Sequence, residues 1–202
     1  MVNRREHLEA FLARTVAIAD ALDRGALEGI VDALVDARAR GGRLFFVGSG
    51  GGAGHASHAV CDFRKIGGFE AYTPSDNVSE LTARINDDGW NTSYVEWLKG
   101  SRLGPDDVLF VFSVGGGDLE RDISANLVNC VEHAKAVGAT VCGVVGRDGG
   151  HTARVADACL VIPTVDESTI TAHTEAWQAL VWHMLVSHPA IQVGAMKWES
   201  ER

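Results

Sequence analysis

Cysteine is scarce and long apolar runs are absent from the 202-residue sequence. The four cysteines are dispersed, without the CxxC spacing of a zinc ribbon, so we expect reduced and mostly buried thiols at Cys61, Cys130, Cys142 and Cys159. No stretch approaches the roughly 18 apolar residues of a membrane span, and the opening MVNRREHLEA lacks the apolar core of a signal peptide. These absences predict a cytoplasmic protein without structural disulfides.

Positive charge is also in deficit, because 18 lysines and arginines stand against 27 aspartates and glutamates, for a formal net charge of −9. The basic residues are scattered, whereas proteins that bind nucleic acid cluster them to neutralise phosphates. We therefore expect no direct nucleic-acid partner and no membrane partner. Hydrophobic residues at 46% and charged residues at 22% are typical of one well-packed globular domain.

Helix and strand patterns alternate along most of the chain. Two helical patterns come first, at 6–22 and 27–39. Short apolar runs then predict buried strands, at 43–47, 106–114, 140–146 and 159–163. Helical patterns follow these runs, at 53–66, 119–138, 152–157 and from Ser168 or Thr169 to 186. Strands that alternate with helices favour an α/β fold with a parallel sheet covered by helices on both faces.

Glycine-rich turns follow two of the predicted strands, in GSGGG at 48–52 and GGG at 115–117. A strand, a glycine turn and a helix bring backbone N–H groups to one point, which suits an anion. In a parallel sheet both turns lie at the carboxyl edge, so we expect one shared ligand site. Two alternatives stay open: the glycines serve only tight turns, or the first turn binds a dinucleotide. The second alternative depends on a loose pattern of Gly48, Gly50 and Ala53, with Glu70 further on.

Histidines and carboxylates gather on two predicted helices. His58 and Asp62 are four residues apart and share one helix face, which His55 joins. One helical turn is a suitable span for two ligands of a single metal ion. On the last helix Glu175 and His183 lie eight residues apart, about 12 Å, so they reach one ion only by stretching or through a neighbouring subunit. The alternative is that these histidines are hydrogen-bonded core or interface residues.

Four motifs, FFVGSGGGAGHASHAVCD, VFSVGGGD, VVGRDGG and EAWQALVWH, resemble the sugar isomerase (SIS) domain family in its phosphoheptose isomerase branch. The likeness covers nearly the whole chain. It implies one SIS domain over 1–202, with N-terminal helices for oligomerisation at 1–41 and an α/β core with a C-terminal helix at 42–202. It also implies a three-layer sandwich around a five-stranded parallel sheet, homotetramers, and zinc at sites between subunits. The implied activity is isomerisation of sedoheptulose 7-phosphate, a ketose, to the aldose D-glycero-D-manno-heptose 7-phosphate.

The resemblance also implies roles for single residues. The family's metal and catalytic set falls on four positions: His58, Asp62, Glu175 and His183. Moving a carbonyl between C1 and C2 takes a proton from one carbon and returns it to the other through an enediol. Asp62 is then the base, and His183 is the acid that serves the carbonyl oxygen. The implied substrate-binding positions are Ser49, Gly50, Gly51, Gly52, Asp87, Ser113, Gly115, Gly116, Gly117, Asp118 and Glu175.

The phosphate loops depart from the family pattern, which is rich in hydroxyl groups. Gly52, Gly115 and Asp118 stand at serine positions, and Ser113 alone is kept. Fewer hydroxyl donors predict weaker phosphate binding, and an ionised Asp118 repels a dianion unless a cation compensates. The candidate cations are Arg64, Lys65 and Arg84.

Other positions differ from the family as well. Asp62 is one methylene shorter than the family's glutamate, and Glu175 replaces a neutral glutamine. Asp87 matches a sugar-binding aspartate, with a loop-capping role as the alternative. The first functional hypothesis is the zinc-dependent isomerase. The alternatives are a non-enzymatic SIS domain that senses a sugar phosphate or engages a replication-initiation partner, and an isomerase of a related sugar.

Overall fold

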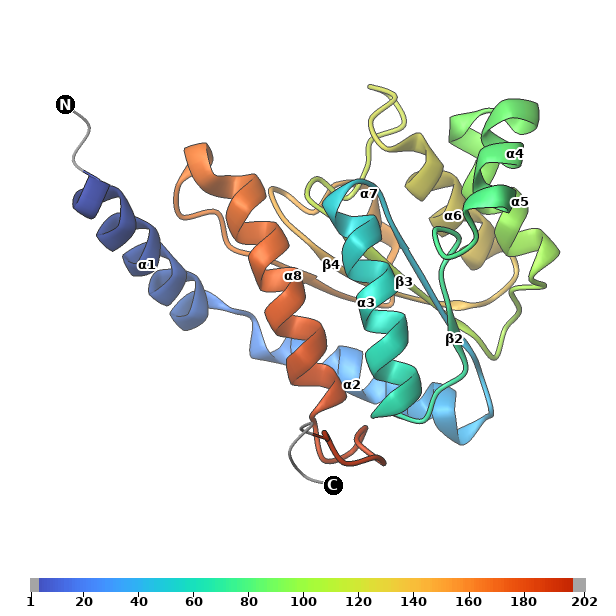
Figure 1. Ribbon diagram of the computed structural model, residues 1–202, viewed down its shortest axis with the longest axis horizontal. Coiled ribbons are helices and arrows are strands. Elements are labelled where there is room, and N and C mark those ends of the chain that lie inside the picture. Colours follow the sequence, from blue (N-terminus) through green and yellow to red (C-terminus); the bar gives the residue numbers. More distant parts are fainter. Residues whose placement is uncertain (1–3, 198–202) are drawn as a thin grey trace.

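Five parallel strands form one sheet in the order β2-β1-β3-β4-β5 (Figure 1). Their bounds are β1 Leu44–Gly48, β2 Ala71–Tyr72, β3 Val108–Ser113, β4 Thr140–Val145 and β5 Ala158–Val161. The computed structural model describes residues 4–197. The predicted apolar runs became β1, β3, β4 and β5, whereas the two-residue β2 has no pattern of its own in the sequence. The expected five-stranded parallel sheet is confirmed.

Helices cover both faces of this sheet. Their bounds are α1 Arg4–Ala21, α2 Arg24–Ala39, α3 Gly51–Lys65, α4 Val78–Asp88, α5 Trp90–Gly100, α6 Ala125–Ala136, α7 Gly150–Val155 and α8 Ile170–Val186, with a 3-10 helix at Glu167–Thr169. Alternate residues of a strand point to opposite faces. Phe46 and Phe110 therefore pack with α2, α3 and α8, while Phe45 and Leu109 pack with α5 and α6. These two buried clusters make the expected three-layer sandwich.

Two simpler expectations are also met. The cysteines are free thiols, with Cys130 and Cys142 buried, Cys159 partly buried and Cys61 exposed. Burial raises the pKa of Cys159 to about 12. No helix within residues 4–197 is both long and apolar enough to cross a membrane.

The helix expected at 119–138 begins later, at Ala125. Asp118 and Ile123 form an antiparallel bridge with N–H to O distances of 2.9 Å in both directions, which closes a small loop. The Asp118 carboxylate accepts two backbone N–H groups of this loop, at 2.9 and 3.2 Å. Ser124 then has a φ of 51°, which an α-helix cannot accommodate. The prediction was wrong here because hydrogen bonds of an aspartate to nearby backbone competed with the helix.

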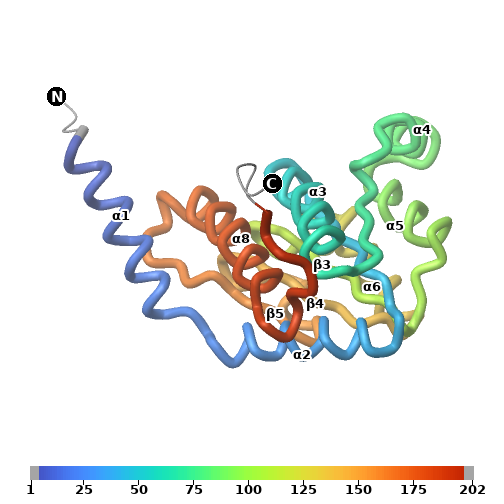
Figure 2. The backbone as a smooth tube through the Cα atoms, turned by 60° about the horizontal axis from the view of Figure 1, so that its bottom comes forward, coloured from blue at the N-terminus to red at the C-terminus, as the bar shows by residue number. Residues whose placement is uncertain are grey.

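Helix α1 projects from the body of the molecule as an arm (Figures 1 and 2). It is anchored where the Phe11 ring stacks on His173 of α8, with ring centroids 4.1 Å apart. Arg14 adds an ion pair with Asp166, at 2.5 Å. His173 is only 3% exposed, and both of its ring nitrogens lie near backbone carbonyls, at 3.2 and 3.4 Å. This histidine is therefore structural and joins α1 to the body.

A buried ion pair joins the beginnings of β1 and β3. Asp107 is 4% exposed and accepts the Arg43 guanidinium at 2.8 and 3.1 Å, with the backbone N–H groups of Arg43 and Gly104 each at 2.9 Å. Burial acts to raise the pKa of Asp107, but these hydrogen bonds outweigh it and hold the pKa below its ordinary value. The carboxylate thus ties together the amino ends of the two central strands.

We expect Asp107→Asn to lower the free energy of unfolding by about 1–3 kcal/mol at pH 7, because charge-assisted hydrogen bonds are lost while the Arg43 guanidinium, 28% exposed, keeps two carbonyl acceptors. The folded pKa is depressed, so the carboxylate stabilises the fold above the ordinary aspartate pKa of about 3.9 and ceases to do so as the pH falls through the folded value. Urea unfolding at pH 7 and pH 3 measures this, and the difference from wild type shrinks at pH 3. Asp36→Asn, at an exposed position of α2, is the control. Wild-type stability of the Asp107 variant at pH 7 contradicts the prediction.

Candidate functional site

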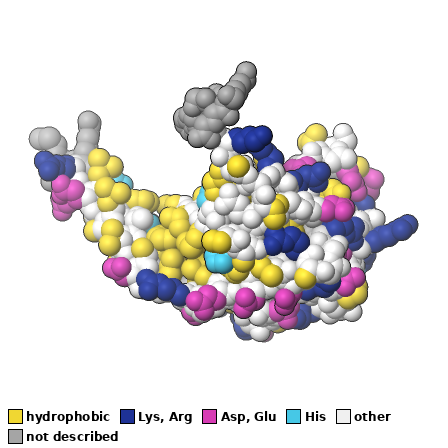
Figure 3. Space-filling model, turned by 90° about the horizontal axis from the view of Figure 1, so that it is seen from below, with side chains coloured by type: hydrophobic (Ala, Val, Ile, Leu, Met, Phe, Trp, Pro, Cys, Tyr) yellow, Lys and Arg dark blue, Asp and Glu magenta, His cyan; other side chains and the backbone are white. Residues whose placement is uncertain are grey.

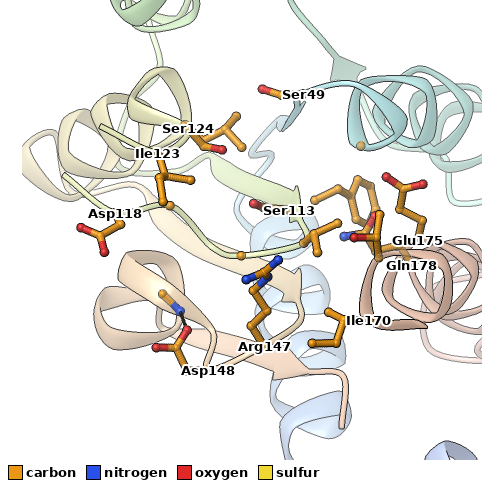
Figure 4. A pocket seen from close by; sticks show the side chains of 18 of the residues that line it. Ser49, Ser113, Asp118, Ile123, Ser124, Arg147, Asp148, Ile170, Glu175 and Gln178 are labelled. Atoms are coloured by element: carbon orange, nitrogen blue, oxygen red, sulfur yellow. Dashed lines mark hydrogen bonds between the residues drawn. The ribbon is translucent and has the colours of Figure 1, made fainter. Parts of the chain in front are cut away.

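A cavity of about 960 Å³ opens at the carboxyl edge of the sheet (Figure 4). The loops after β1, β3 and β4 and the start of α8 surround it. Of the predicted substrate-binding residues, those that line it are Ser49, Gly52, Ser113, Gly115, Gly117, Asp118 and Glu175. Gly50, Gly51 and Gly116 belong to the same loops but do not line the cavity. Asp87 lies elsewhere, exposed on α4, where it accepts a hydrogen bond from Asn86 at 2.8 Å.

Serine hydroxyls remain at the cavity. Ser113 Oγ accepts the Gly116 N–H at 3.0 Å, and Ser49 Oγ accepts the Asn126 amide at 3.0 Å. Because both oxygens act as acceptors, their own O–H groups remain to donate to a ligand. Ser124, at the start of α6, also lines the cavity. Sequence reasoning missed it because the expected helix covered that position.

The two glycines at the expected serine positions, Gly52 and Gly115, have different surroundings. A Cβ added to Gly52 lies 2.6 Å from the Phe112 carbonyl oxygen, so the start of α3 is in direct backbone contact with β3. A Cβ added to Gly115 meets only Arg147 Cδ, at an ordinary 3.7 Å. The missing serine at 52 is therefore required by the packing of this chain, whereas a side chain at 115 has room.

Helices α3 and α8 lie side by side and run in the same direction (Figure 1). At the cavity end, His55 Nδ1 meets Gln178 Oε1 at 2.9 Å. At the far end, Asp62 Oδ2 accepts the Trp182 indole N–H at 3.0 Å. The buried Gln178 amide donates to the Val144 carbonyl at 3.0 Å, so its oxygen is the acceptor and His55 Nδ1 is the donor. His55 thus links α3 to α8.

Glu175 lies at the cavity end of the contact between α3 and α8. A Cβ added to Gly51 lies 2.6 Å from its carboxylate, so the carboxylate rests against the first turn of α3. Its position in Figure 4 is close to that of Gln178, on the α8 side of the cavity. The structure therefore separates Glu175 from His183 by two turns of α8, about 12 Å.

The other end of the contact between α3 and α8 holds a cluster of three possible metal ligands, His58, Asp62 and His183. Their ligand atoms all lie within 4.8 Å of one another. The Nε2 atoms of His58 and His183 approach Asp62 Oδ2 at 3.6 and 3.5 Å. His183 Nδ1 donates to the Ala179 carbonyl at 2.7 Å, which leaves the lone pair on Nε2. Two imidazole nitrogens and a carboxylate are ligands of catalytic zinc sites, so this donor set fits zinc. The chain brings three of the four predicted ligands together.

The cation that accompanies Asp118 is not one of those suggested by the sequence. Arg121, from the same loop, pairs with Asp118 at 3.6 Å. Arg64 donates to a backbone carbonyl of β2 at 3.0 Å, and Arg84 pairs within α4 at 2.8 Å. Neither of these, nor Lys65, lines the cavity. The prediction that one of these three cations compensates Asp118 was wrong, because all three lie on helices that flank the site. Arg121 was missed because it belongs to the loop that was expected to be helical.

The dinucleotide alternative fails on the position of Glu70. This residue precedes β2 and lies at the amino edge of the sheet, opposite the glycine loops. Its carboxylate accepts the Tyr72 hydroxyl at 2.9 Å. An acid that binds a ribose hydroxyl must lie at the carboxyl edge, beside the glycine turn.

The sequence and the fold of the chain are similar to those of known proteins. Residues 9–146 match the SIS domain family. The chain is 35% identical over 166 residues to lincomycin biosynthesis protein LmbN of Streptomyces lincolnensis, across 77% of this chain and 58% of that protein. It is 30% identical over 181 residues to phosphoheptose isomerase of Paramagnetospirillum magneticum, across 86% and 87%. Its fold matches phosphoheptose isomerase of Neisseria gonorrhoeae with a TM-score of 0.78 at 23% identity, across 90% and 97%.

A five-stranded parallel sheet with its ligand loops at the carboxyl edge is the architecture of a SIS domain, and the chain belongs to that family. The match covers more than half of the chain. Within the family, its relatives place it in the phosphoheptose isomerase branch.

We expect Gly52→Ser and Gly115→Ser to differ in stability. The Cβ at 52 collides with the Phe112 carbonyl, so we expect the free energy of unfolding to fall by about 1–3 kcal/mol. The serine at 115 fits and should cost less than about 0.5 kcal/mol. Urea unfolding measures both values. Gly54→Ser is the control, because nothing lies within 4 Å of its added Cβ. Equal destabilisation at 52 and 115 contradicts the prediction.

Proposed function

We propose that the protein is an aldose–ketose isomerase that converts sedoheptulose 7-phosphate to D-glycero-D-manno-heptose 7-phosphate. The observation that carries the proposal is that one pair of helices, α3 and α8, joins the cavity at the glycine loops to the His58, Asp62 and His183 cluster. The relative from P. magneticum named phosphoheptose isomerase supports it.

The proposed roles follow from the chemistry of the carbonyl shift. Asp62 removes a proton from one carbon of the substrate and returns it to the neighbouring carbon, and His183 exchanges a proton with the carbonyl oxygen. Trp182 holds Asp62 by its Oδ2 atom. Asp62 Oδ1 has no hydrogen-bond partner among residues 4–197, so it is the oxygen that remains to act as base.

Zinc is the proposed cofactor. We propose that His58, Asp62 and His183 hold it, and that Glu175 joins them where a neighbouring copy brings it close. Because His183 Nδ1 is bonded to the Ala179 carbonyl, Nε2 holds either the metal or a proton, and His183 acts as the acid only while Nε2 is free of the metal. A bound zinc ion supplies polarisation of the carbonyl and hydroxyl oxygens of the substrate.

Exposed apolar side chains support a homotetramer with sites between subunits. Leu180 and Met184, which flank His183 on α8, are 44% and 39% exposed. On α1, a stripe at intervals of four residues is 61–65% exposed and consists of Leu8, Leu12 and Val16. Figure 3 shows hydrophobic side chains gathered between the projecting arm and the body. We propose that further copies cover this surface, and that the assembly works in the cytoplasm on a sugar phosphate.

An isomerase of a related phosphosugar is the second candidate. The relative LmbN is more similar, at 35% identity, and its name assigns it to lincomycin biosynthesis. The glycines at 52 and 115 also alter the phosphate loops. Both observations favour a substrate that differs from that of phosphoheptose isomerase.

Turnover tests the proposed function directly. The zinc-loaded full chain is incubated with sedoheptulose 7-phosphate and with related ketose phosphates, and aldose formation is followed. We expect Asp62→Asn and His183→Ala to lower kcat by about 100-fold or more, and Asp36→Asn to leave it unchanged. No turnover of any of these sugars with zinc bound overturns the isomerase proposal, and sugar-phosphate binding without turnover favours a sensor. Wild-type turnover in both site variants overturns the assigned roles.

Zinc affinity tests the metal proposal separately. We expect His183→Ala and Asp62→Ala to weaken zinc binding by at least about tenfold, because each removes one of three converging donors. Competition with a chromophoric chelator measures the affinity. The control is His151→Ala, whose ring pairs with Glu132 at 2.6 Å outside the cluster. Loss of zinc affinity in the His151 variant, or none in the other two, contradicts this assignment.

A further inference from the structure

Arg147 lies in the turn that follows β4, and its guanidinium points into the cavity (Figure 4). The Gly149 N–H closes this turn by donating to the Gly146 carbonyl at 2.9 Å. The Arg147 side chain is exposed, and it makes no hydrogen bond or ion pair with any residue in the range 4–197. Its charge is thus available to a ligand, unlike that of Arg121, which is paired with Asp118.

The backbone of Arg147 is strained. Its φ is +54°, in the left-handed region that glycine adopts freely and other residues adopt at a cost. Residues held in this region by the surrounding structure cluster at functional sites, so the position of Arg147 beside the cavity raises the question of its function. Glycine at this position would serve the turn better, so the reason for an arginine lies in its side chain.

The neighbours of Arg147 indicate what that side chain binds. Its Cδ lies 3.7 Å from the place of a Cβ on Gly115, so the side chain passes over a position that offers no side-chain donor of its own. Ser113 and Ser124 line the same cavity. A guanidinium has a permanent charge and five N–H donors in a fork that matches the oxygens of a phosphate.

We propose that Arg147 binds the phosphoryl group of the substrate and supplies the donors that the glycine at 115 beside it does not. For the identity of the substrate this inference rests on the proposed function, but phosphate binding is measurable without turnover. Carboxylates also line the cavity, namely Asp118, Asp148, Glu167 and Glu175. They repel a dianion from their own parts of the wall. Asp148 follows Arg147 in the chain, but its carboxylate accepts the Gly150 N–H at 3.2 Å and is directed away from the guanidinium (Figure 4). The space beside the guanidinium is therefore the position proposed for the dianion.

Arginine-to-glycine variants separate this role from a structural one. Arg147→Gly removes the guanidinium and relieves the positive φ, so we expect it to fold and to have a higher Tm than wild type. Arg102→Gly is the matched control, because Arg102 has a φ of +55°, is exposed and lies outside the cavity. Arg147→Lys keeps the charge without the planar fork, so its response to phosphate should lie between those of wild type and Arg147→Gly.

Two measurements decide the proposal. Inorganic phosphate should raise the Tm of wild type and of Arg102→Gly but not that of Arg147→Gly. With sedoheptulose 7-phosphate, the KM of Arg147→Gly should rise about tenfold or more while kcat stays within about twofold, since a charge-assisted contact to the phosphate is lost. The proposal is overturned if phosphate raises the Tm of Arg147→Gly as much as that of wild type and the KM of this variant equals the wild-type value. It is also overturned if phosphate does not raise the Tm of wild type.

Failure of this inference is distinguishable from failure of the proposed function. If wild type turns over no sugar phosphate, but the phosphate shift disappears only in Arg147→Gly, the anion site stands and the isomerase assignment falls. If wild type is an active isomerase and the KM of Arg147→Gly equals that of wild type, the isomerase assignment is supported and the proposed role of Arg147 is overturned. Loss of the phosphate shift in Arg154→Gln but not in Arg147→Gly also overturns the role of Arg147, because Arg154 is the other lining cation without an ion pair among residues 4–197.

Discussion

Backbone-to-backbone contact at the carboxyl edge of the sheet is the constraint on which the rest of the structure depends. A Cβ on Gly52 would lie 2.6 Å from the Phe112 oxygen, and one on Gly116 would lie 1.9 Å from the Gly149 oxygen. Because no side chains separate them, the loops after β1, β3 and β4 rest directly on one another. Tyr94 adds support from α5, where its hydroxyl donates to a carbonyl of the first loop at 3.1 Å. The cavity wall is therefore a rigid product of the fold.

The fixed start of α3 in turn places the chemistry. A helix rises about 1.5 Å and turns about 100° per residue, so a first turn held against β3 determines where His55 and Asp62 lie. Their contacts with α8, at 2.9 Å to Gln178 and 3.0 Å to Trp182, require both helices to keep the same register. A slip of one residue would rotate both side chains away from α8. Cavity and cluster are thus coupled through one helix pair.

The sequence predicted what local patterns determine. Apolar runs predicted four strands, and one-turn spacing placed His58 and Asp62 on one face. It did not predict β2, which is a strand only because β1 lies beside it, with Leu44 opposite Ala71. Nor did it predict that residues 118–124 form a loop before α6, since this loop depends on hydrogen bonds between the Asp118 carboxylate and the nearby backbone. Arg147 lies within the VVGRDGG motif, but the sequence assigned it no role, because the role proposed for it depends on a turn conformation and on the empty place beside Gly115.

The exposure of the cluster is consistent with the proposed assembly of several copies. The side chains of His58 and His183 are 58% and 53% exposed, whereas an isomerase must keep water from its enediol. The apolar residues that flank His183 cannot provide this cover, because they are exposed themselves. In the proposed assembly a second surface covers the cluster, and the arm formed by α1 presents one of the same apolar character. The core and the Arg43–Asp107 pair lie within one chain, so folding can precede the proposed assembly.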